Sequence, residues 1–291
     1  MPLSHFFDLV KFEPERASYD ITRFILKETM RQVYLGGVVG LSGGVDSALC
    51  AYMMVEALGP DKVIGVSLCE THSWDKDLEH AKLVADELGI QFIDFPITPI
   101  LNELNFYEHI KDVDFAALHK ELTDSPDQFI EPPMMEYNTR VKLRARGFIL
   151  THFAKLHHYF QCQTLHQSEI LLGFLDPFGD AVGDIAPIHH LYKMEIFELA
   201  KHMGVPDEII QRPPMSGNMN RDGHWTDEDD MMMPFGECDL ILYLLDRGNS
   251  ADDVKRLVDL PEWKVDKVHE AFEYAKVYHA IPTKLQREDM K

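Results

Sequence analysis

The sequence predicts an α/β fold, a single doubly wound parallel sheet of five or six strands with helices on both faces. In the first hundred residues, short apolar runs of strand length alternate with segments of helical periodicity, and the connections are brief. Apolar residues make up 45% and charged residues 26% of the 291-residue chain, which is typical of a globular protein with a large core. No repeat or linker composition divides the chain, so we expect one domain over residues 1–291.

The elements follow in order. A helix is expected over 18–32, where apolar residues recur at helical spacing, and Gly36-Gly37 separates it from a strand at 38–41. Four further elements are predicted by the same criteria: a helix over 46–58, a strand over 62–68, a helix over 75–88 and a strand over 91–97. The crossovers between parallel strands should be right-handed.

The second part of the chain is less regular. Residues 100–137 contain an acidic and proline-containing stretch, which we expect to be a surface excursion serving as a lid or an interface element. The remaining expectations are a helix over 140–160, a weak strand at 170–172, a loop over 176–187, a helix over 191–203, an irregular segment over 213–233, and helices alternating with turns in the last sixty residues. The Met231-Met232-Met233 run is interpreted as core or interface filling.

Charge and cysteine content exclude several classes of protein. The formal net charge is −21, which argues against nucleic acid as a partner because DNA and RNA binding depends on basic side chains. Four cysteines without a C-x-x-C pair indicate a reducing compartment rather than a disulfide framework. The N-terminus lacks the pattern of a secretory signal, and no apolar run approaches the roughly 18 residues of a membrane span. We therefore expect a cytoplasmic protein without membrane contact.

The sharpest motif is Ser42-Gly43-Gly44-Val45-Asp46-Ser47, which lies directly between a predicted strand and a predicted helix. Glycines allow backbone N–H groups to approach an oxyanion closely, and a helix N-terminus favours negative charge. Ser42 and Ser47 add hydroxyl donors. Because Asp46 would repel a phosphate, its presence implies that a Mg²⁺ ion lies between them. The motif therefore predicts a phosphate-binding loop, and the plainer interpretation is a capped strand-to-helix turn.

This loop resembles the SGGxDS pyrophosphate loop of the ATP-pyrophosphatase (PP-loop) superfamily, and later segments resemble one family within it. Thr164-Leu165-His166-Gln167-Ser168-Glu169, the segment FGDAVGDIAPI at 178–188 and Lys193 follow the order and spacing of motifs in NAD synthetases. The Arg144-Ala145-Arg146 segment and the run from Trp225 to Asp229 are similar to two further motifs of that family. The resemblance covers roughly residues 18–282 and is to the ammonia-dependent form.

The resemblance implies an adenine nucleotide alpha hydrolase-like sheet and an ATP-dependent amidation. Deamido-NAD would be converted by ATP to an acyl-adenylate, which ammonia would attack to give NAD, AMP and pyrophosphate. It also implies a homodimer, for which the apolar helix at 21–33 is a candidate contact. Two other classes stay open, namely a PP-loop adenylating amidotransferase with a different carboxylate substrate and a non-catalytic nucleotide-binding relative.

The same resemblance assigns roles to individual residues. Asp46 and Glu169 would hold Mg²⁺, Lys193 would contact the pyrophosphate, and Thr164 would donate a hydroxyl. Asp180 would lie near the nicotinyl carboxylate and the ammonium ion, while Asp184 would support that loop or the substrate. The ATP and pyrophosphate contacts would come from Ser42, Gly43, Gly44, Asp46, Ser47, Thr164, Lys193 and Ser216. Substrate contacts would come from Arg144, Arg146, Asp180 and Asp184.

Three positions depart from the family pattern. Met215 stands where the family has Ser or Thr, so either Ser216 takes over a pyrophosphate contact or that contact is missing. Arg140 stands where the family has Asn. The segment 174–178 (FLDPF) lacks a lysine that the family carries near the active-site loop. The last two departures fall where the dinucleotide should be recognised. The histidine pairs at 157–158 and 189–190 lack metal-ligand spacing and are interpreted as structural.

Overall fold

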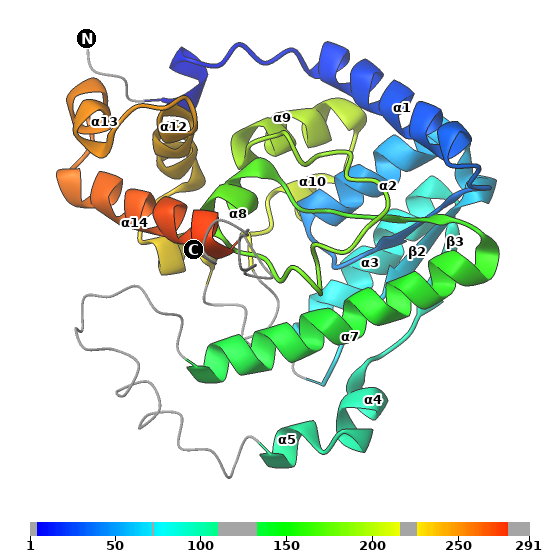
Figure 1. Cartoon of the computed structure of the whole chain (residues 1–291). Coiled ribbons are helices and arrows are strands. Elements are labelled where there is room, and N and C mark those ends of the chain that lie inside the picture. The colour runs from blue at the N-terminus through cyan, green and yellow to red at the C-terminus, as the bar shows by residue number, and fades with distance from the viewer. Residues whose placement is uncertain (1–4, 72, 110–132, 216–225, 279–291) are drawn as a thin grey trace, which may run out of the picture.

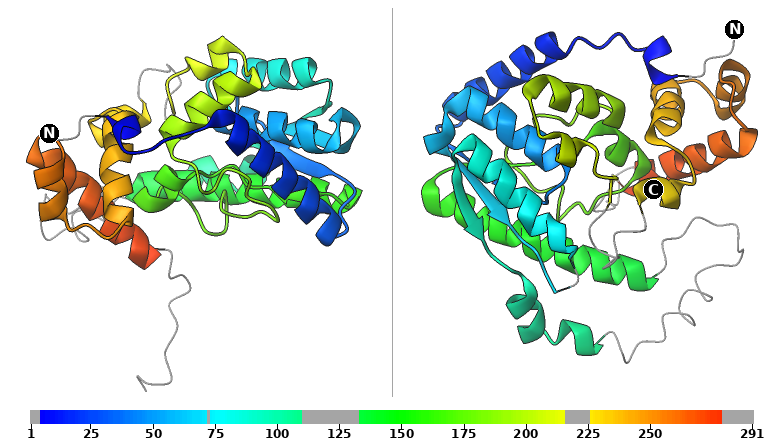
Figure 2. Two further views of the ribbon diagram at one scale, coloured as in Figure 1. Left: turned by 90° about the horizontal axis from the view of Figure 1, so that it is seen from above. Right: turned by 180° about the vertical axis from the view of Figure 1, so that it is seen from behind.

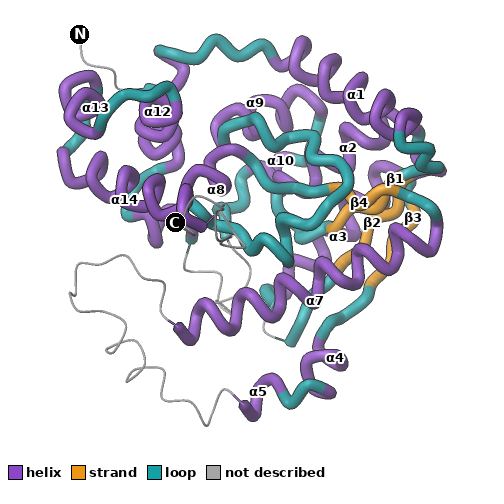
Figure 3. Tube along the Cα trace, in the orientation of Figure 1, coloured by secondary structure: helices purple, strands orange, loops and turns teal. Residues whose placement is uncertain are grey.

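The computed structural model describes residues 5–71, 73–109, 133–215 and 226–278, with side chains from residue 140 onward in the third range. Within these residues the core is a four-stranded parallel sheet with strand order β3-β2-β1-β4 (Figure 3). Strand β1 spans Gly37–Gly40, β2 Val63–Ser67, β3 Gln91–Asp94 and β4 Phe160–Cys162. The predicted β-α-β-α-β order of the first hundred residues is confirmed.

Helices cover both faces of this sheet, as predicted (Figures 1 and 2). Val39 of β1 belongs to a buried core that also contains residues of α1 (Pro14–Arg31), α2 (Val45–Leu58), α3 (Asp75–Leu88) and α9 (Lys193–Met203). Val38, whose side chain points to the opposite face, is buried with Ile149 and Ala154 of α7 (Pro133–His157). Strands buried on both faces explain why the sequence shows apolar runs rather than alternation.

The C-terminal helices form a lobe with its own apolar core. It comprises α12 (Phe235–Asp246), α13 (Ala251–Leu257) and α14 (Glu262–Tyr278), which pack around Leu240 and Ile241. The lobe meets the sheet domain through α8 (Gln167–Leu172) and the start of α9, since Leu172 and Tyr192 belong to the same core. Met231 and Met233 are buried there as predicted, whereas Met232 is exposed.

The structure corrects several predicted elements. The predicted strand at 170–172 is the end of helix α8, which begins with a capping box between His166 and Glu169. The predicted helix over 140–160 ends at His157, and Phe160–Cys162 form strand β4. The sheet has four strands in the described residues rather than five or six, and the loop after it adds one isolated bridge, from Cys162 to Ile185.

Other differences concern boundaries and short helices. Helix α1 begins at Pro14, a residue suited to the first helical turn, rather than at 18. The segment predicted to be irregular contains α11 (Asp227–Met231), and α10 (Asp207–Ile210) lies just before it. The excursion begins with α4 (Thr98–Glu103) and α5 (Phe106–His109) and ends in the first turns of α7, while residues 110–132 lie outside the described part. Two 3-10 helices, Phe6–Asp8 and Pro60–Lys62, also occur in the described part of the chain. None of the described helices is both long and apolar enough to cross a membrane.

A buried ion pair connects α5 and α7 to the loop after β2. Lys142 Nζ donates to Glu70 Oε1 at 2.6 Å, and the side chains of both residues are at most 1% exposed. Tyr107 donates its hydroxyl to Glu70 Oε2 at 2.7 Å. Because a buried charge is tolerated only when it is paired, this network fixes the loop between β2 and α3 against α7.

Helix α7 also touches the loop that carries Asp180. A Cβ atom added at Gly147 would lie 2.6 Å from the carbonyl oxygen of Gly179. Only glycine therefore allows this close approach.

We predict that Gly147→Ala displaces the Asp180 loop and destabilises the protein by about 1–3 kcal/mol, despite the better helix propensity of alanine. Thermal unfolding measures the change. Gly236→Ala is the matched control, since it also lies in a helix but its added Cβ would meet nothing closer than 3.7 Å. Equal melting temperatures for the two variants would contradict the close contact.

Candidate active site

A cavity of about 830 Å³ opens at the carboxyl ends of the strands, where ligands bind in open α/β sheets. Its base comes from the residues at or just after these ends: Gly40 and Leu41, Val66 and Leu68, and Cys162. Residues far apart in the sequence meet in it, including the phosphate-loop candidate, Thr164, Glu169, Asp180 and Lys193. Most of the side chains that the sequence singled out are therefore gathered at one place.

The loop at 42–47 has the geometry of a preformed anion site. Gly43 has a φ of +78°, and a Cβ there would lie 2.7 Å from the carbonyl oxygen of Asp77, so glycine is required. Helix α2 begins at Val45, directly after the loop. Ser47 Oγ donates to the carbonyl of Gly44 at 3.0 Å and accepts the N–H of Ser42 at 3.2 Å. The loop thus holds its shape by internal bonds while the helix N-terminus favours negative charge.

Lys193 reaches this loop from the first turn of α9. Its Nζ donates to both carboxylate oxygens of Asp46, at 2.7 Å each. Burial disfavours the charge of Lys193, but Asp46 and Glu169 outweigh it and raise the pKa of the ammonium. Burial likewise opposes ionisation of Asp46, and the Lys193 ammonium lowers its pKa in spite of it. Both groups are therefore charged at neutral pH.

His166 was not predicted as a site residue, although it lies inside the TLHQSE segment. Its side chain is 1% exposed, and its Nε2 lies 3.7 Å from Asp46 Oδ1 and 3.5 Å from Glu169 Oε2. Burial and the nearby Lys193 lower its pKa to about 3, so the ring is neutral. Since Nδ1 accepts the N–H of Glu169 at 3.4 Å, the proton resides on Nε2 and faces the two carboxylates.

Asp46 and Glu169 are the residues that fit a divalent cation. Burial, and then the Asp46 carboxylate, raise the pKa of Glu169 well above its usual value, which indicates a carboxyl whose negative charge is poorly compensated. Mg²⁺ is usually bound by one or two protein carboxylates together with the phosphates of a substrate. Two carboxylates beside a phosphate loop match this arrangement. Within the described residues no group of three or more His, Cys, Asp or Glu forms a complete protein metal centre.

Asp180 lies on the wall of the cavity near Arg146 and Gly147. Its Oδ1 accepts the backbone N–H of Asp176 at 2.6 Å. Burial, with a further contribution from the Asp176 carboxylate, outweighs the backbone hydrogen bonds and raises the pKa of Asp180 to about 6. The carboxyl therefore titrates close to neutral pH, where it can exchange a proton with a ligand.

The predicted substrate-binding residues divide into two groups. Arg146 lines the cavity and donates Nε to the carbonyl of Leu68 at 3.2 Å. Arg144 instead forms a forked contact with Asp176, Nε to Oδ1 at 3.1 Å and Nη2 to Oδ2 at 3.0 Å, and is not part of the lining. Asp184 is also absent from the lining: it pairs with Lys155 at 2.9 Å and accepts the N–H of Gln161 at 2.8 Å, which supports the loop against β4.

The segment after α10 also contributes. Met215, which departs from the family pattern, lines the cavity together with Pro213 and Pro214. Ser216, proposed to replace a pyrophosphate contact, lies outside the described residues. Arg212 lines the cavity beside the phosphate loop. It was missed because a single arginine in an irregular segment carries no pattern.

Two apolar surfaces extend the cavity. The first is formed by aliphatic side chains at the strand ends with Leu143 and Leu150 of α7. The second lies between α8 and the C-terminal lobe. Its lining comprises Leu172, Phe174, Leu175, Val268, Ala271 and Tyr274. Ligand sites of this kind combine apolar walls with a few polar groups that fix orientation.

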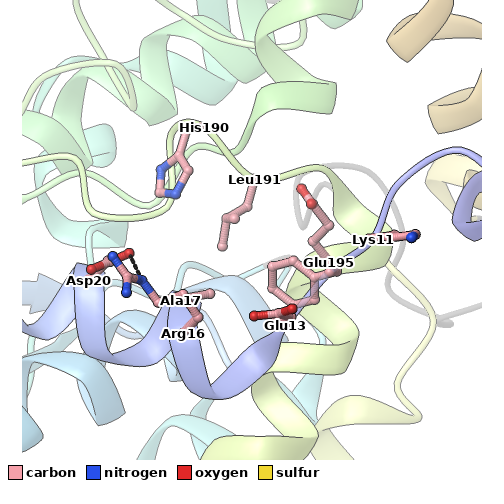
Figure 4. A pocket seen from close by; sticks show the side chains of 9 residues that line it. Lys11, Glu13, Arg16, Ala17, Asp20, His190, Leu191 and Glu195 are labelled. Atoms are coloured by element: carbon pink, nitrogen blue, oxygen red, sulfur yellow. Dashed lines mark hydrogen bonds and ion pairs between the residues drawn. The ribbon is translucent and has the colours of Figure 1, made fainter.

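A smaller hollow of about 320 Å³ lies elsewhere, between the start of α1 and the segment before α9 (Figure 4). Three of its charged side chains serve the protein's own contacts: Arg16 pairs with Asp20 at 2.7 Å, and Glu195 accepts the N–H of Tyr192 at 2.8 Å. It contains none of the predicted site residues.

Comparison with known proteins identifies the family. A family model described as NAD synthase matches residues 18–279. The NH(3)-dependent NAD(+) synthetase of Methanocaldococcus jannaschii is 35% identical over 241 residues, covering 83% of this chain and 85% of the relative. The protein of the same name from Thermotoga maritima is 33% identical, covering 82% and 93% respectively.

Solved structures show the same fold. The NMN synthetase of Francisella tularensis superposes with a TM-score of 0.75 at 21% identity, covering 95% of this chain and all of the other. The NH3-dependent NAD synthetase of Campylobacter jejuni superposes with a TM-score of 0.69, also at 21% identity and with the same coverage. At this identity the likeness concerns the fold. The sequence match, which spans nearly the whole chain and includes the residues gathered in the cavity, shows that this chain belongs to the NAD synthase family.

Proposed function

We propose that this chain is a ligase that amidates deamido-NAD with ammonia at the expense of ATP, giving NAD, AMP and pyrophosphate. The observation that carries the proposal is the contact of Lys193 with both oxygens of Asp46, because it joins two widely separated motifs of the family's series at one phosphate loop. The relatives matched over most of the chain carry that activity in their names.

The binding of ATP follows from the cavity. The β- and γ-phosphates would lie against the loop at 42–47, with Lys193 contributing positive charge and Thr164 a hydroxyl. The adenine ring would lie against the aliphatic surface formed by the strand ends. Magnesium, held by Asp46 and Glu169, would neutralise phosphate charge. The substrate carboxylate then attacks the α-phosphorus, and pyrophosphate leaves.

Asp180 is suited to the second half of the reaction. Its carboxylate would bind an ammonium ion and take one proton from it, so that neutral ammonia attacks the acyl carbonyl and AMP leaves with the bonding electrons. A carboxyl with a pKa of about 6 accepts a proton far more readily than an ordinary aspartate.

The test supplies ATP, NH₄⁺, Mg²⁺ and either deamido-NAD or its mononucleotide counterpart, and measures AMP and the amidated product. We expect NAD formation with the dinucleotide and one AMP per NAD. Product from the mononucleotide alone would favour the open alternative of a different carboxylate substrate.

Asp46→Asn should reduce the rate of pyrophosphate release at least a hundredfold, because the variant loses the charge that pairs with Lys193 and holds Mg²⁺. The variant should still fold and show a cooperative melting transition. Asp61→Asn, on an exposed turn before β2, is the control and should behave as the parent. Turnover of Asp46→Asn close to the parent rate would refute the role of Asp46.

The pH dependence of amidation should report Asp180. Its pKa is raised, so the carboxylate is present above about pH 6 and is lost as the pH falls through that value. We expect the amidation rate to fall about tenfold for each pH unit below 6. Asp180→Asn should abolish this acid limb of the pH–rate profile while it keeps the exchange of pyrophosphate into ATP. A limb near pH 4 in the parent would contradict the assignment.

We also propose a homodimer and a cytoplasmic location. Met30, Val33 and Leu35 at the end of α1 are 61–71% exposed, and Leu156 of α7 is 65% exposed. The segment after α1 lies beside the end of α7, because the N–H of Leu35 donates to the carbonyl of His158 at 3.1 Å. An exposed patch of this kind suits a second copy of the chain, since monomers seldom leave one uncovered. The four free cysteines suit a reducing compartment.

Charged substitutions in this patch should separate the protomers. Met30→Glu combined with Val33→Glu should shift the sedimentation mass from twice the chain mass to one chain mass, because burying two carboxylates opposes association. Leu257→Glu, on α13, is the control and should leave the dimer intact. A parent protein that sediments as a monomer at micromolar concentration would exclude the proposal.

A further inference from the structure

Arg212 is a second cation at the phosphate loop. Lys193 contacts the loop at Asp46, whereas Arg212 contacts its beginning: Nη1 lies 3.4 Å from the carbonyl oxygen of Ser42 and 3.0 Å from the position that a Cβ on Gly43 would take. Glycine at position 43 is therefore needed for two reasons: it allows the positive φ of the turn, and it leaves room for the guanidinium of Arg212. Arg212, Ser42, Gly44 and Lys193 all line the same cavity.

The guanidinium is held in place by groups from the start of α3. Its Nη2 donates to Asp77 Oδ1 at 2.6 Å, and the two side chains are 6% and 8% exposed. Its central carbon lies 4.9 Å from the centre of the Trp74 ring. An aromatic face and a carboxylate fix the plane of an arginine, so the fork needs little ordering when an anion arrives.

The geometry leaves donors for a ligand. A guanidinium has five N–H donors, and the contacts to Asp77 and Ser42 involve only Nη1 and Nη2, each of which carries a second N–H. Planar donors of this kind match phosphate oxygens. Because Lys193 is already bonded to both oxygens of Asp46, it neutralises only part of the charge that accumulates on a departing pyrophosphate.

We propose that Arg212 binds the β- and γ-phosphates of ATP and the pyrophosphate product, and that Asp77 and Trp74 position it. The inference rests on the proposed binding of ATP at this loop. It assigns to the cavity a phosphate contact from the segment that follows α10.

The experiment measures ligand binding by calorimetry with the full chain and Mg²⁺, using α,β-methylene-ATP, inorganic pyrophosphate and AMP. Arg212→Gln should weaken the analogue and pyrophosphate at least tenfold, since charge-assisted hydrogen bonds to phosphate are lost. AMP lacks the two outer phosphates, so its affinity for Arg212→Gln should be within twofold of its affinity for the parent. The KM for ATP should rise while the KM for deamido-NAD stays within twofold.

A double variant distinguishes phosphate binding by Arg212 from the alternative that Arg212 only neutralises the charge of Asp77. Arg212→Gln leaves the buried Asp77 carboxylate unpaired, so part of its effect could come from local destabilisation. Adding Asp77→Asn removes that charge and should restore the melting temperature without restoring pyrophosphate affinity. Asp77→Asn alone should lower pyrophosphate affinity less than Arg212→Gln does, because the guanidinium remains and loses only the carboxylate that positions it.

The outcomes are distinct. If the parent binds the analogue and Arg212→Gln binds it and pyrophosphate equally well, the role of Arg212 is refuted and the proposed function stands. If the double variant recovers pyrophosphate affinity, Arg212 acts only on Asp77 and the proposal is also refuted. A parent chain that binds neither analogue nor pyrophosphate overturns the proposed function together with this inference.

Discussion

The ion pair between Lys193 and Asp46 is the contact on which the rest of the site depends. It joins residues 147 positions apart in the chain, and it places the start of α9 against the start of α2. A buried ion pair is retained only if the remaining polar groups around it are satisfied. Asp239 of α12 supplies part of this support: it accepts the hydroxyl of Ser168 at 2.6 Å and the N–H of Met194 at 2.9 Å, and Ser168 Oγ accepts the N–H of Lys193 at 2.9 Å. The C-terminal lobe therefore positions the lysine.

The electrostatics of the cavity follow from that pair. Lys193 and Asp46 stabilise each other, and Glu169 is left beside Asp46 with a raised pKa. His166 stays neutral, so it cannot offset the second carboxylate. Such an imbalance costs stability in the free protein and is typical of a site completed by its ligands. Under the proposed function, a cation would offset the charge of Glu169 and Lys193 would face the phosphates, so a chain with a net charge of −21 could bind a polyanion at this point.

The sequence predicts most of the fold but only part of the site. The β1–α2–β2–α3–β3 order is recognisable because apolar residues recur at clear helix or strand spacing and the turns contain glycine. Strand β4 escapes prediction because its three residues follow an apolar helix almost directly. The apolar run of Ile170, Leu171 and Leu172 favours a strand where the structure has α8. Only the capping box of His166 and Glu169 indicated a helix there. The phosphate loop follows from local chemistry, whereas the roles of Lys193 and Glu169 came from the family resemblance. Arg212, His166 and Asp239 depend on packing that no local pattern encodes.

Two departures from the family pattern are in contact with each other, and this gives them a common physical explanation. Arg140 stands in place of asparagine and Asp176 lies in the altered segment 174–178, yet Arg140 Nη1 lies 3.5 Å from Asp176 Oδ2. The Asp176 side chain is fully buried, and Arg144 supplies the stronger forked contact. A buried carboxylate requires such partners, and Arg140 adds a second, longer contact to the one that Arg144 makes with Asp176. The N–H of Asp176 also donates to Asp180 Oδ1. In this chain, the pairing of Asp176 with arginine side chains therefore helps to hold the Asp180 loop, in a segment that lacks the lysine of the family pattern. The departures therefore change which side chains order this wall of the cavity, while the N–H of Asp176 still holds the Asp180 carboxyl in the lining.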